Sequence, residues 1–221
     1  MANNKKDKKT NTVKNVNQKK ITGICIAAGV LVAILIFFGA FKLINGSNTK
    51  EELSMETVKV LLEMENGSDF TLELYPDYAP ETVANFTKLV KEGFYDGLTF
   101  HRIVDGFMAQ GGDPEGTGMG GSKDKIKGEF SSNGFSKNTL SHTRGVISMA
   151  RSMDPNSASS QFFICYDDAS FLDGQYAAFG KVIEGMETVD AFLDVERTAN
   201  SMGEIAVPKT PVKMKHLSVI E

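Results

Sequence analysis

The sequence predicts a mainly β fold, a closed antiparallel barrel with two helices, preceded by one N-terminal transmembrane helix. Two observations predict the barrel: residues 57–221 hold many short strand-like runs separated by Gly, Asp and Asn, and only two stretches there have helical spacing. Closing such a sheet removes its exposed edges. The third observation is an uncharged apolar run at residues 21–41, long enough for a membrane-spanning helix.

Residues 1–20 form a basic tail. They hold seven lysines and one aspartate among Asn and Thr, a composition typical of a solvated segment. Removing these charges from the chain's 24 basic and 28 acidic groups leaves residues 21–221 with a net charge of about −10. This acidic remainder argues against nucleic acid as a partner.

The apolar run at 21–41 (ITGICIAAGVLVAILIFFGAF) spans the hydrocarbon core, about 30 Å, at about 1.5 Å rise per residue. The alternative is a cleaved signal peptide, whose apolar stretch is usually about 7–15 residues long and ends in small residues. Phe38-Gly39-Ala40 places a bulky residue at that site, which favours an uncleaved anchor. The lysines before the helix then place the N-terminus in the cytoplasm and the domain outside. Cleavage would instead release a secreted domain.

A polar stretch at 42–56 is typical of a short linker, so the globular domain is expected at 57–221. The two cysteines, Cys25 in the apolar run and Cys165 in a strand-like run, are interpreted as small buried residues without a disulfide.

The domain begins with a predicted hairpin. Apolar residues alternate over 58–64 and again over 70–74, and Asn66-Gly67 supplies the turn. Pro80 then starts a helix with an apolar stripe, and Gly93 is placed to end it. Short strands follow in the runs LTFHRI, FMAQG, GVISMA, QFFICY and AAFGKVI, before a second helix near 186–195 and a last strand near 212–220.

Five sequence segments carry a resemblance to a known family. They are FHRIVDGFMAQGGD at 100–113, SMAR at 148–151, SSQFFI at 159–164, FLDG at 171–174 and AFGKV at 178–182. In this order and spacing the chain resembles the cyclophilins over residues 57–221. The resemblance implies an eight-stranded barrel with two capping helices, and a peptidyl-prolyl cis/trans isomerase that needs no cofactor or metal.

The residues themselves favour the same chemistry. One strand pair would present polar Arg102 and Gln110 beside apolar Phe107 and Met108, with Phe163 joining from a neighbouring strand. An apolar slot with one cation at its edge suits a proline ring and its carbonyl. The X-Pro bond rotates slowly because of its partial double-bond character, with a barrier of about 18–20 kcal/mol. A hydrogen-bond donor aimed at the deconjugated imide nitrogen would bind the twisted transition state selectively.

The resemblance assigns that donor to Arg102, with Gln110 and Phe107 completing the catalytic set. It places the remaining site residues in the proline pocket and along the peptide groove; they are Met108, Gly116, Ala150, Arg151, Gln161, Phe163, Phe171, Leu172 and Tyr176.

Three positions depart from the best-known eukaryotic pattern of the family. Phe171 stands where that pattern has Trp, Tyr176 where it has His, and Arg151 where it has Asn. Phe171 lacks the indole N–H, which predicts weak binding of the cyclic peptide cyclosporin. Tyr176 keeps a ring with a polar tip, so proline binding should survive.

Other sites are disfavoured. The histidines, His101, His142 and His216, are too scattered for a metal site, and strand alternation turns His101 away from Arg102's face. The glycine-rich stretch 116–123 has its Ser and Lys in the wrong order for a phosphate loop and instead predicts a tight loop beside the groove. No G-x-S-x-G motif frames a nucleophile.

The expected role is isomerisation of X-Pro bonds in exported or cell-envelope proteins, by a monomer held at the cell membrane. The main alternative is a non-catalytic peptide-binding or chaperone module on the same fold. A structural anchor protein is a third class, and it predicts no binding of proline peptides.

Overall fold

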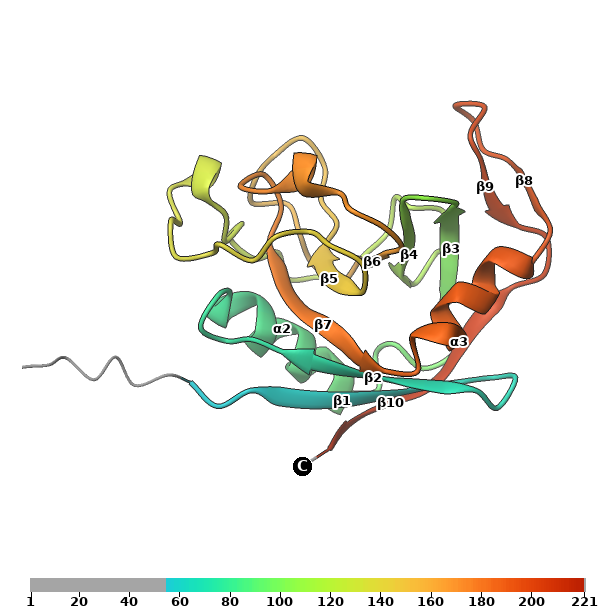
Figure 1. The fold of residues 1–221 in the computed structure, drawn as a ribbon, viewed down its shortest axis with the longest axis horizontal. Coiled ribbons are helices and arrows are strands. Elements are labelled where there is room, and N and C mark those ends of the chain that lie inside the picture. Colours follow the sequence, from blue (N-terminus) through green and yellow to red (C-terminus); the bar gives the residue numbers. More distant parts are fainter. Residues whose placement is uncertain (1–54, 221) are drawn as a thin grey trace, which may run out of the picture. The chain divides into compact units, whose positions relative to one another are not determined.

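The computed structural model describes residues 55–220, in which eight strands close into an antiparallel barrel (Figure 1). Around the barrel the order is β1-β10-β3-β4-β6-β5-β7-β2. The strands are β1 (Val58–Met64), β2 (Asp69–Leu74), β3 (Thr99–Val104), β4 (Met108–Asp113), β5 (Val146–Met149), β6 (Phe162–Cys165), β7 (Ala178–Glu184) and β10 (Val212–Ile220). The predicted barrel, its first hairpin and its last strand are confirmed.

The basic tail, the apolar run at 21–41 and most of the linker lie outside the described residues. Within residues 55–220, no helix combines the length and apolar character needed to cross a membrane.

Both predicted helices are present. Helix α2 (Pro80–Lys91) has Pro80 in its first turn and is followed by Gly93, whose φ of 68° only glycine adopts readily. Its buried stripe includes Phe86, which contacts the rings of Tyr95 and Phe179 in the barrel core. The second helix is shorter than predicted: α3 (Met186–Asp190) continues as a 3₁₀ turn over Ala191–Asp194. Two further 3₁₀ turns cover Ser131–Asn133 and Ser170–Leu172.

One hairpin was not predicted. Strands β8 (Arg197–Ala199) and β9 (Ile205–Pro208) pair with each other outside the barrel, and β9 contacts β3. Figure 1 shows the hairpin projecting beyond the barrel at the end where β3 and β4 meet. Its strands are short and largely exposed, so they lack the apolar alternation that marks the barrel strands.

Strand alternation separates two apolar clusters. Phe162 and Ile164 of β6 point into the large core of the barrel, together with Phe100 of β3. Phe163 and Cys165, one residue out of step, belong to a second, smaller cluster on the other face of the sheet. That cluster contains Met108, Phe163, Cys165, Ala169 and Leu172, with Val104, Phe107, Ala150 and Tyr176 packed against it.

Candidate active site

The site is built on a row of cross-strand neighbours on the outer face of the barrel. Arg102 of β3 lies opposite Gln110 of β4, and Gln110 lies opposite Phe163 of β6. Ser148 of β5 continues the row beyond Phe163. The grouping of Arg102, Gln110 and Phe163 predicted from the sequence is therefore present in the structure.

A β-bulge in β3 gives the row its register. The pairing with β4 shifts between Phe100 and Arg102, leaving His101 without a partner of its own. Phe100 and Ile103 are consequently both in the core, although plain alternation would put them on opposite faces. His101 lies close to Gly118 in the glycine-rich loop, whereas Arg102 donates a hydrogen bond to Gln110. The side chains of His101 and Arg102 therefore contact different parts of the structure.

The second apolar cluster forms one wall of a cavity of about 280 Å³. Nine of the predicted site residues line it: Arg102, Phe107, Met108, Gln110, Ala150, Arg151, Phe163, Leu172 and Tyr176. The cavity therefore has one apolar wall, and two cations, Arg102 and Arg151, also line it. It is large enough for a proline ring and its flanking backbone.

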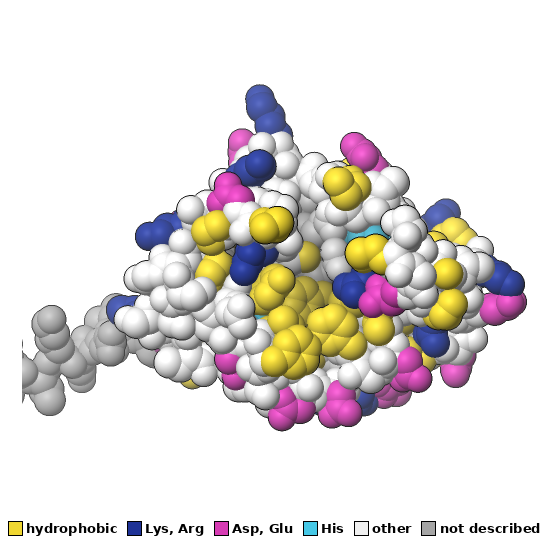
Figure 2. All heavy atoms as spheres, turned by 90° about the horizontal axis from the view of Figure 1, so that it is seen from above, with side chains coloured by type: hydrophobic (Ala, Val, Ile, Leu, Met, Phe, Trp, Pro, Cys, Tyr) yellow, Lys and Arg dark blue, Asp and Glu magenta, His cyan; other side chains and the backbone are white. Residues whose placement is uncertain are grey.

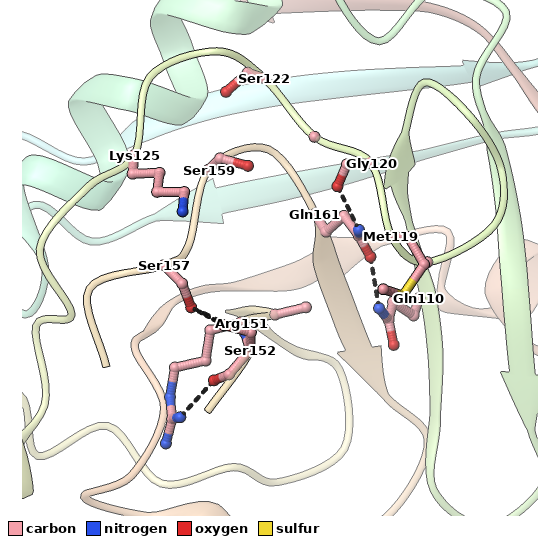
Figure 3. Close-up of a pocket in the computed structure, with 13 residues that line it drawn as sticks. Gln110, Met119, Gly120, Ser122, Lys125, Arg151, Ser152, Ser157, Ser159 and Gln161 are labelled. Carbon is pink, nitrogen blue, oxygen red and sulfur yellow. Dashed lines mark hydrogen bonds between the residues drawn. The ribbon is translucent and has the colours of Figure 1, made fainter. Parts of the chain in front are cut away.

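A second, larger cavity of about 470 Å³ shares Gln110, Ala150 and Arg151 with the first. Figure 3 shows Lys125 and Ser159 on one side of it and Met119 on the other. Because the two cavities share residues, together they form one groove with room for an extended peptide.

A chain of hydrogen bonds links the groove to Arg102. Figure 3 shows its bonds between Gln110, Gln161 and Gly120. Arg102 Nη1 donates to Gln110 Oε1 at 3.4 Å, and Gln110 Nε2 donates to Gln161 Oε1 at 2.8 Å. Gln161 Nε2 then donates to the carbonyl of Gly120 at 2.8 Å. Since each amide accepts at one end and donates at the other, the bonds reinforce one another and fix both glutamines.

The guanidinium of Arg102 has an unpredicted partner, Glu204 in the β8–β9 hairpin. Arg102 Nε donates to Glu204 Oε2 at 2.7 Å and Nη2 donates to Oε1 at 2.8 Å. These bonds lower the pKa of the Glu204 carboxyl, against the opposing effect of burial. The hairpin's turn sequence, from Asn200 to Glu204, is visible in the chain, but no sequence signal connects it to a residue 102 positions away.

The glycine-rich segment forms the tight loop expected beside the groove. It wraps around the carboxylate of Asp113, which accepts hydrogen bonds from the backbone N–H groups of Glu115, Thr117, Gly118 and Gly120. Burial would raise the pKa of Asp113, but these four donors together lower it. The loop's N–H groups are thus occupied internally rather than arranged around a phosphate.

Two of the three departures from the family pattern line the cavity. The guanidinium of Arg151 lies 4.5 Å from the ring centroid of Tyr176, and its Nη2 donates to the carbonyl of Gln175 at 2.8 Å. Arg151 is therefore fixed as a wall of the groove.

Two predicted site residues line neither cavity. Phe171 is 64% exposed and packs against Phe107, with 5.7 Å between ring centroids. Gly116 is exposed in the loop, and the larger cavity is lined instead by residues 118–122 of the same loop. Gln161 lines the larger cavity but not the smaller one.

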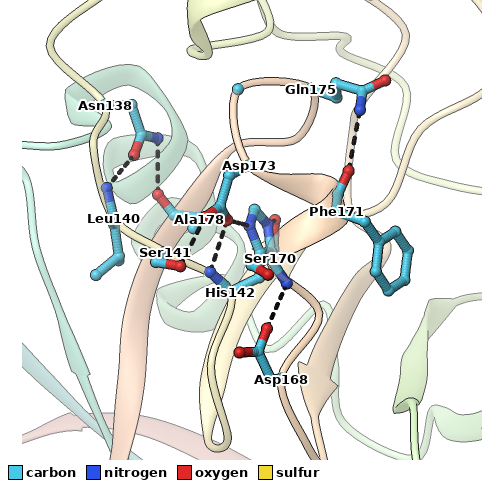
Figure 4. A network of polar contacts seen from close by, with 12 residues as sticks. Asn138, Leu140, Ser141, His142, Asp168, Ser170, Phe171, Asp173, Gln175 and Ala178 are labelled. Atoms are coloured by element: carbon cyan, nitrogen blue, oxygen red, sulfur yellow. Dashed lines mark hydrogen bonds and ion pairs between the residues drawn. The ribbon is translucent and has the colours of Figure 1, made fainter.

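A polar network centred on the buried His142 adjoins the apolar wall. Figure 4 shows the hydrogen bonds that join His142 and Ser141 to Asp173. The ring of His142 stacks on that of Phe163, with 6.1 Å between centroids. His142 Nδ1 lies 2.8 Å from Asp173 Oδ1, and its Nε2 lies 2.9 Å from Ser148 Oγ. Since a carboxylate only accepts, Nδ1 carries the proton and Ser148 donates to Nε2.

Asp173, His142 and Ser148 are hydrogen-bonded in the same sequence as the Asp, His and Ser of a hydrolytic triad, but the serine hydroxyl is not accessible to a substrate. Ser148 and His142 are both fully buried, at 0% exposure, so no substrate carbonyl reaches the hydroxyl. The thiol of Cys165 is equally inaccessible, and burial raises its pKa to about 12. Neither group is accessible as a nucleophile for the groove, and the polar side chains that do line the smaller cavity are those of Arg102, Gln110, Arg151 and Tyr176.

The buried His142 predicts a stability loss on acidification. Burial lowers its pKa below the unfolded value of about 6.5, outweighing the opposing effect of Asp173. Between the unfolded pKa and this lower folded pKa, the unfolded chain binds a proton that the folded chain does not. The free energy of unfolding should therefore fall as the pH decreases below about 6.5.

Urea denaturation at pH 7.5 and 5.5 checks this prediction. His142→Gln should be less stable than wild type at both pH values but should show a smaller difference between them. An equal difference in the two proteins would assign the pH dependence to other groups, such as His101, whose pKa burial also lowers.

Over residues 55–220, no group of three or more His, Cys, Asp or Glu side chains is placed to bind a metal ion. His216, the third histidine, lies on the surface with Nδ1 2.9 Å from Asp96 Oδ2.

Comparisons with known proteins agree with this fold. A family model described as cyclophilin type peptidyl-prolyl cis-trans isomerase/CLD matches residues 59–219. Peptidyl-prolyl cis-trans isomerase B of Bacillus subtilis is 48% identical over 124 residues, covering 56% of this chain and 82% of that protein. A peptidyl-prolyl cis-trans isomerase of Helicobacter pylori is 44% identical over 141 residues, covering 64% and 83% of the two chains.

Solved structures give the same result. The crystal structure of a Cryptosporidium parvum cyclophilin type peptidyl-prolyl cis-trans isomerase superposes with a TM-score of 0.65 at 30% identity, covering 75% of this chain and 99% of that one. A structure of that protein in the presence of the dipeptide Ala-Pro superposes with a TM-score of 0.64 at 31% identity, covering 74% of this chain and 99% of that one.

Proposed function

Because the chain belongs to the cyclophilin-type peptidyl-prolyl cis-trans isomerase family, we propose that it accelerates X-Pro isomerisation during the folding of exported proteins, with Arg102 stabilising the twisted imide. The isomerase activity follows from the family and its relatives. The observation that carries the role of Arg102 is its position beside the apolar wall of the cavity, where Met108, Phe163 and Leu172 lie.

In this mechanism the proline ring enters the cavity between Phe107, Met108 and Phe163. Arg102 Nη1, which lies 3.4 Å from Gln110 and 3.8 Å from the sulfur of Met108, is a donor directly beside that wall. As the C–N bond twists, the imide nitrogen gains acceptor strength, and a donor placed in advance stabilises the transition state more than the ground state. No covalent intermediate is needed.

The barrier reduction that catalysis requires can be compared with the energy of one hydrogen bond from Arg102. Reducing tens of seconds to milliseconds takes a factor of about 10⁴, or about 5–6 kcal/mol. A charge-assisted hydrogen bond contributes roughly 1.5–3 kcal/mol net. We assign the remainder to desolvation of the amide by the apolar wall and to restraint of the flanking peptide in the groove.

The activity is tested by the rate of cis-to-trans isomerisation of an Ala-Pro peptide in the presence of the protein. Catalysis by wild type is expected. A protein that binds the peptide but leaves its isomerisation rate unchanged would be the non-catalytic peptide-binding module instead.

We also propose that the protein is anchored in the cell membrane, with the domain outside the cytoplasm. The support is the uncharged run at 21–41, preceded by seven lysines. In fractionated cells the intact protein should sediment with membranes and resist extraction by high salt. External protease should degrade the domain in cells with an opened envelope and a closed cytoplasmic membrane. Recovery of a shortened protein in the medium would indicate cleavage of the apolar run.

A role on unfolded clients is supported by exposed apolar side chains. Figure 2 shows hydrophobic side chains gathered at the centre of the face that it displays. Met119 beside the groove is 87% exposed, Met153 two residues after Arg151 is 96% exposed, and Met202 in the β8–β9 hairpin is 81% exposed. Flexible methionines adapt to many apolar partners, so they suit a variable unfolded chain.

Replacing Met153 and Met202 by serine should therefore lower kcat/KM for a proline-limited protein refolding reaction by roughly threefold or more, because each substitution removes apolar contact area. Catalysis on a four-residue peptide, which fills only the groove, should not change. Met55→Ser is the matched control, since Met55 is exposed and lines neither cavity. Equal loss on peptide and protein would contradict this role.

Cyclosporin binding should be weak and should improve on Phe171→Trp. The exposed ring of Phe171 offers an apolar surface but no donor, whereas Trp would add an indole N–H at the cavity's rim. One added hydrogen bond is worth roughly 0.5–1.5 kcal/mol, or about 2- to 12-fold in Kd. Calorimetric titration measures both proteins. Nanomolar affinity for wild type would contradict the prediction.

A further inference from the structure

The ion pair between Arg102 and Glu204 divides the guanidinium into two edges. The Nε and Nη2 groups face the carboxylate at 2.7 and 2.8 Å, in the two-bond geometry that fixes the guanidinium plane. Nη1 is the nitrogen left on the other side, toward Gln110 and Met108. The carboxylate thus occupies the edge that faces away from the apolar wall.

Glu204 is itself held by the turn that carries it. Asn200 Nδ2 donates to Glu204 Oε2 at 3.0 Å, and Asn200 Oδ1 accepts the backbone N–H groups of Met202 and Glu204. The backbone N–H of Asn200 donates to the carbonyl of Glu204 at 2.8 Å, and Gly203 closes the turn with a φ of 82°. The carboxylate is therefore held by its own turn as well as by Arg102.

Stability alone does not account for this arrangement. The side chains of Arg102 and Glu204 are 28% and 29% exposed, and ion pairs with such access to water contribute little to folding. The hairpin also lies outside the barrel, so the barrel does not need it for closure. What the pair does fix is the direction of a long, otherwise flexible side chain.

We propose that Glu204 is a positioning residue for the isomerase reaction: it clamps the Nε–Nη2 edge of Arg102 so that Nη1 is presented to the imide of the bound proline. The inference rests on the proposed function of Arg102. A carboxylate that merely sequestered Arg102 would draw the guanidinium out of the cavity, whereas Arg102 lines it. Positioning acts in the transition state, so loss of Glu204 should lower kcat rather than raise KM.

The first test compares kcat and kcat/KM of the full chain on an Ala-Pro peptide. Glu204→Ala should lower both by about tenfold, because a displaced donor loses transition-state contact. Glu204→Gln keeps one acceptor oxygen, so its kcat and kcat/KM should lie between those of Glu204→Ala and wild type. The matched control is Glu196→Gln, since Glu196 pairs with Lys209 at the base of the same hairpin, away from both cavities. The kcat and kcat/KM of Glu196→Gln should stay within twofold of the wild-type values.

Two further measurements separate positioning from a structural role. In an Arg102→Ala background, Glu204→Ala should lower kcat/KM by less than twofold, because the residue acts only through Arg102. In wild type the Arg102 Nε–Hε NMR signal should be resolved and slow to exchange with water, and Glu204→Ala should broaden it.

Activity of Glu204→Ala equal to or above that of wild type would overturn the proposal, and an increase would show that the carboxylate restrains Arg102. A tenfold loss that persists in the Arg102→Ala background would also overturn it. Absence of wild-type activity would instead refute the proposed function, leaving the NMR signal to report the ion pair.

Discussion

Replacing Arg102 by alanine should lower kcat/KM for an Ala-Pro peptide by roughly 100-fold, the upper part of the range that one lost charge-assisted hydrogen bond supplies. The upper part applies because Arg102 is half-buried beside the apolar wall of Phe107 and Met108, where water screens the interaction less than in bulk. Its loss should appear in kcat and kcat/KM together, since the bond strengthens only as the imide twists.

Arg102→Lys should retain part of the activity. It keeps a positive charge at the cavity's edge but not the planar fork that bonds Glu204 on one side and Gln110 on the other. Arg144→Ala is the matched control, since Arg144 pairs with Asp190 and lines neither cavity. A loss of less than about tenfold, or 1.4 kcal/mol, for Arg102→Ala would contradict its catalytic role.

The largest loss of stability is expected from Glu129→Ala, at about 3–5 kcal/mol. The carboxylate of Glu129, only 3% exposed, accepts hydrogen bonds from the backbone N–H groups of Glu81 and Thr82 at the start of α2. It also accepts the hydroxyl of Thr82 at 2.7 Å. The residue before the helix is Ala79, which offers no capping side chain, so Glu129 supplies the cap from elsewhere in the chain.

For a domain of this size, such a loss lowers Tm by roughly 6–20 °C. Thermal unfolding followed by circular dichroism measures it. Glu92→Ala, at the exposed C-terminal end of the same helix, should change Tm by little. A Tm for Glu129→Ala within about 2 °C of wild type would mean that water replaces the cap at small cost.

The barrel could be predicted because its strands and helices follow from patterns of residues that are close together in the sequence. Alternation in β1 and β2, the turn at Asn66-Gly67 and the helical stripe of α2 each depend on residues close together in the chain. The sequence also predicted that Phe163 joins Gln110 from a neighbouring strand, and the structure has the two as cross-strand neighbours. The second helix was predicted too long because its apolar spacing continues through Ala191–Asp194, where the backbone tightens to a 3₁₀ turn.

What the sequence by itself determined is therefore the strands of the barrel, the helical stripe of α2, and nine of the residues that line the smaller cavity. Only the tertiary structure decided the bulge at His101, the cap that Glu129 gives to α2 and the clamp that Glu204 places on Arg102. The physical reason is distance along the chain. Periodicity reports whether a position is buried, but a hydrogen bond between residues 47 or 102 positions apart depends on where the connecting segments cross the barrel.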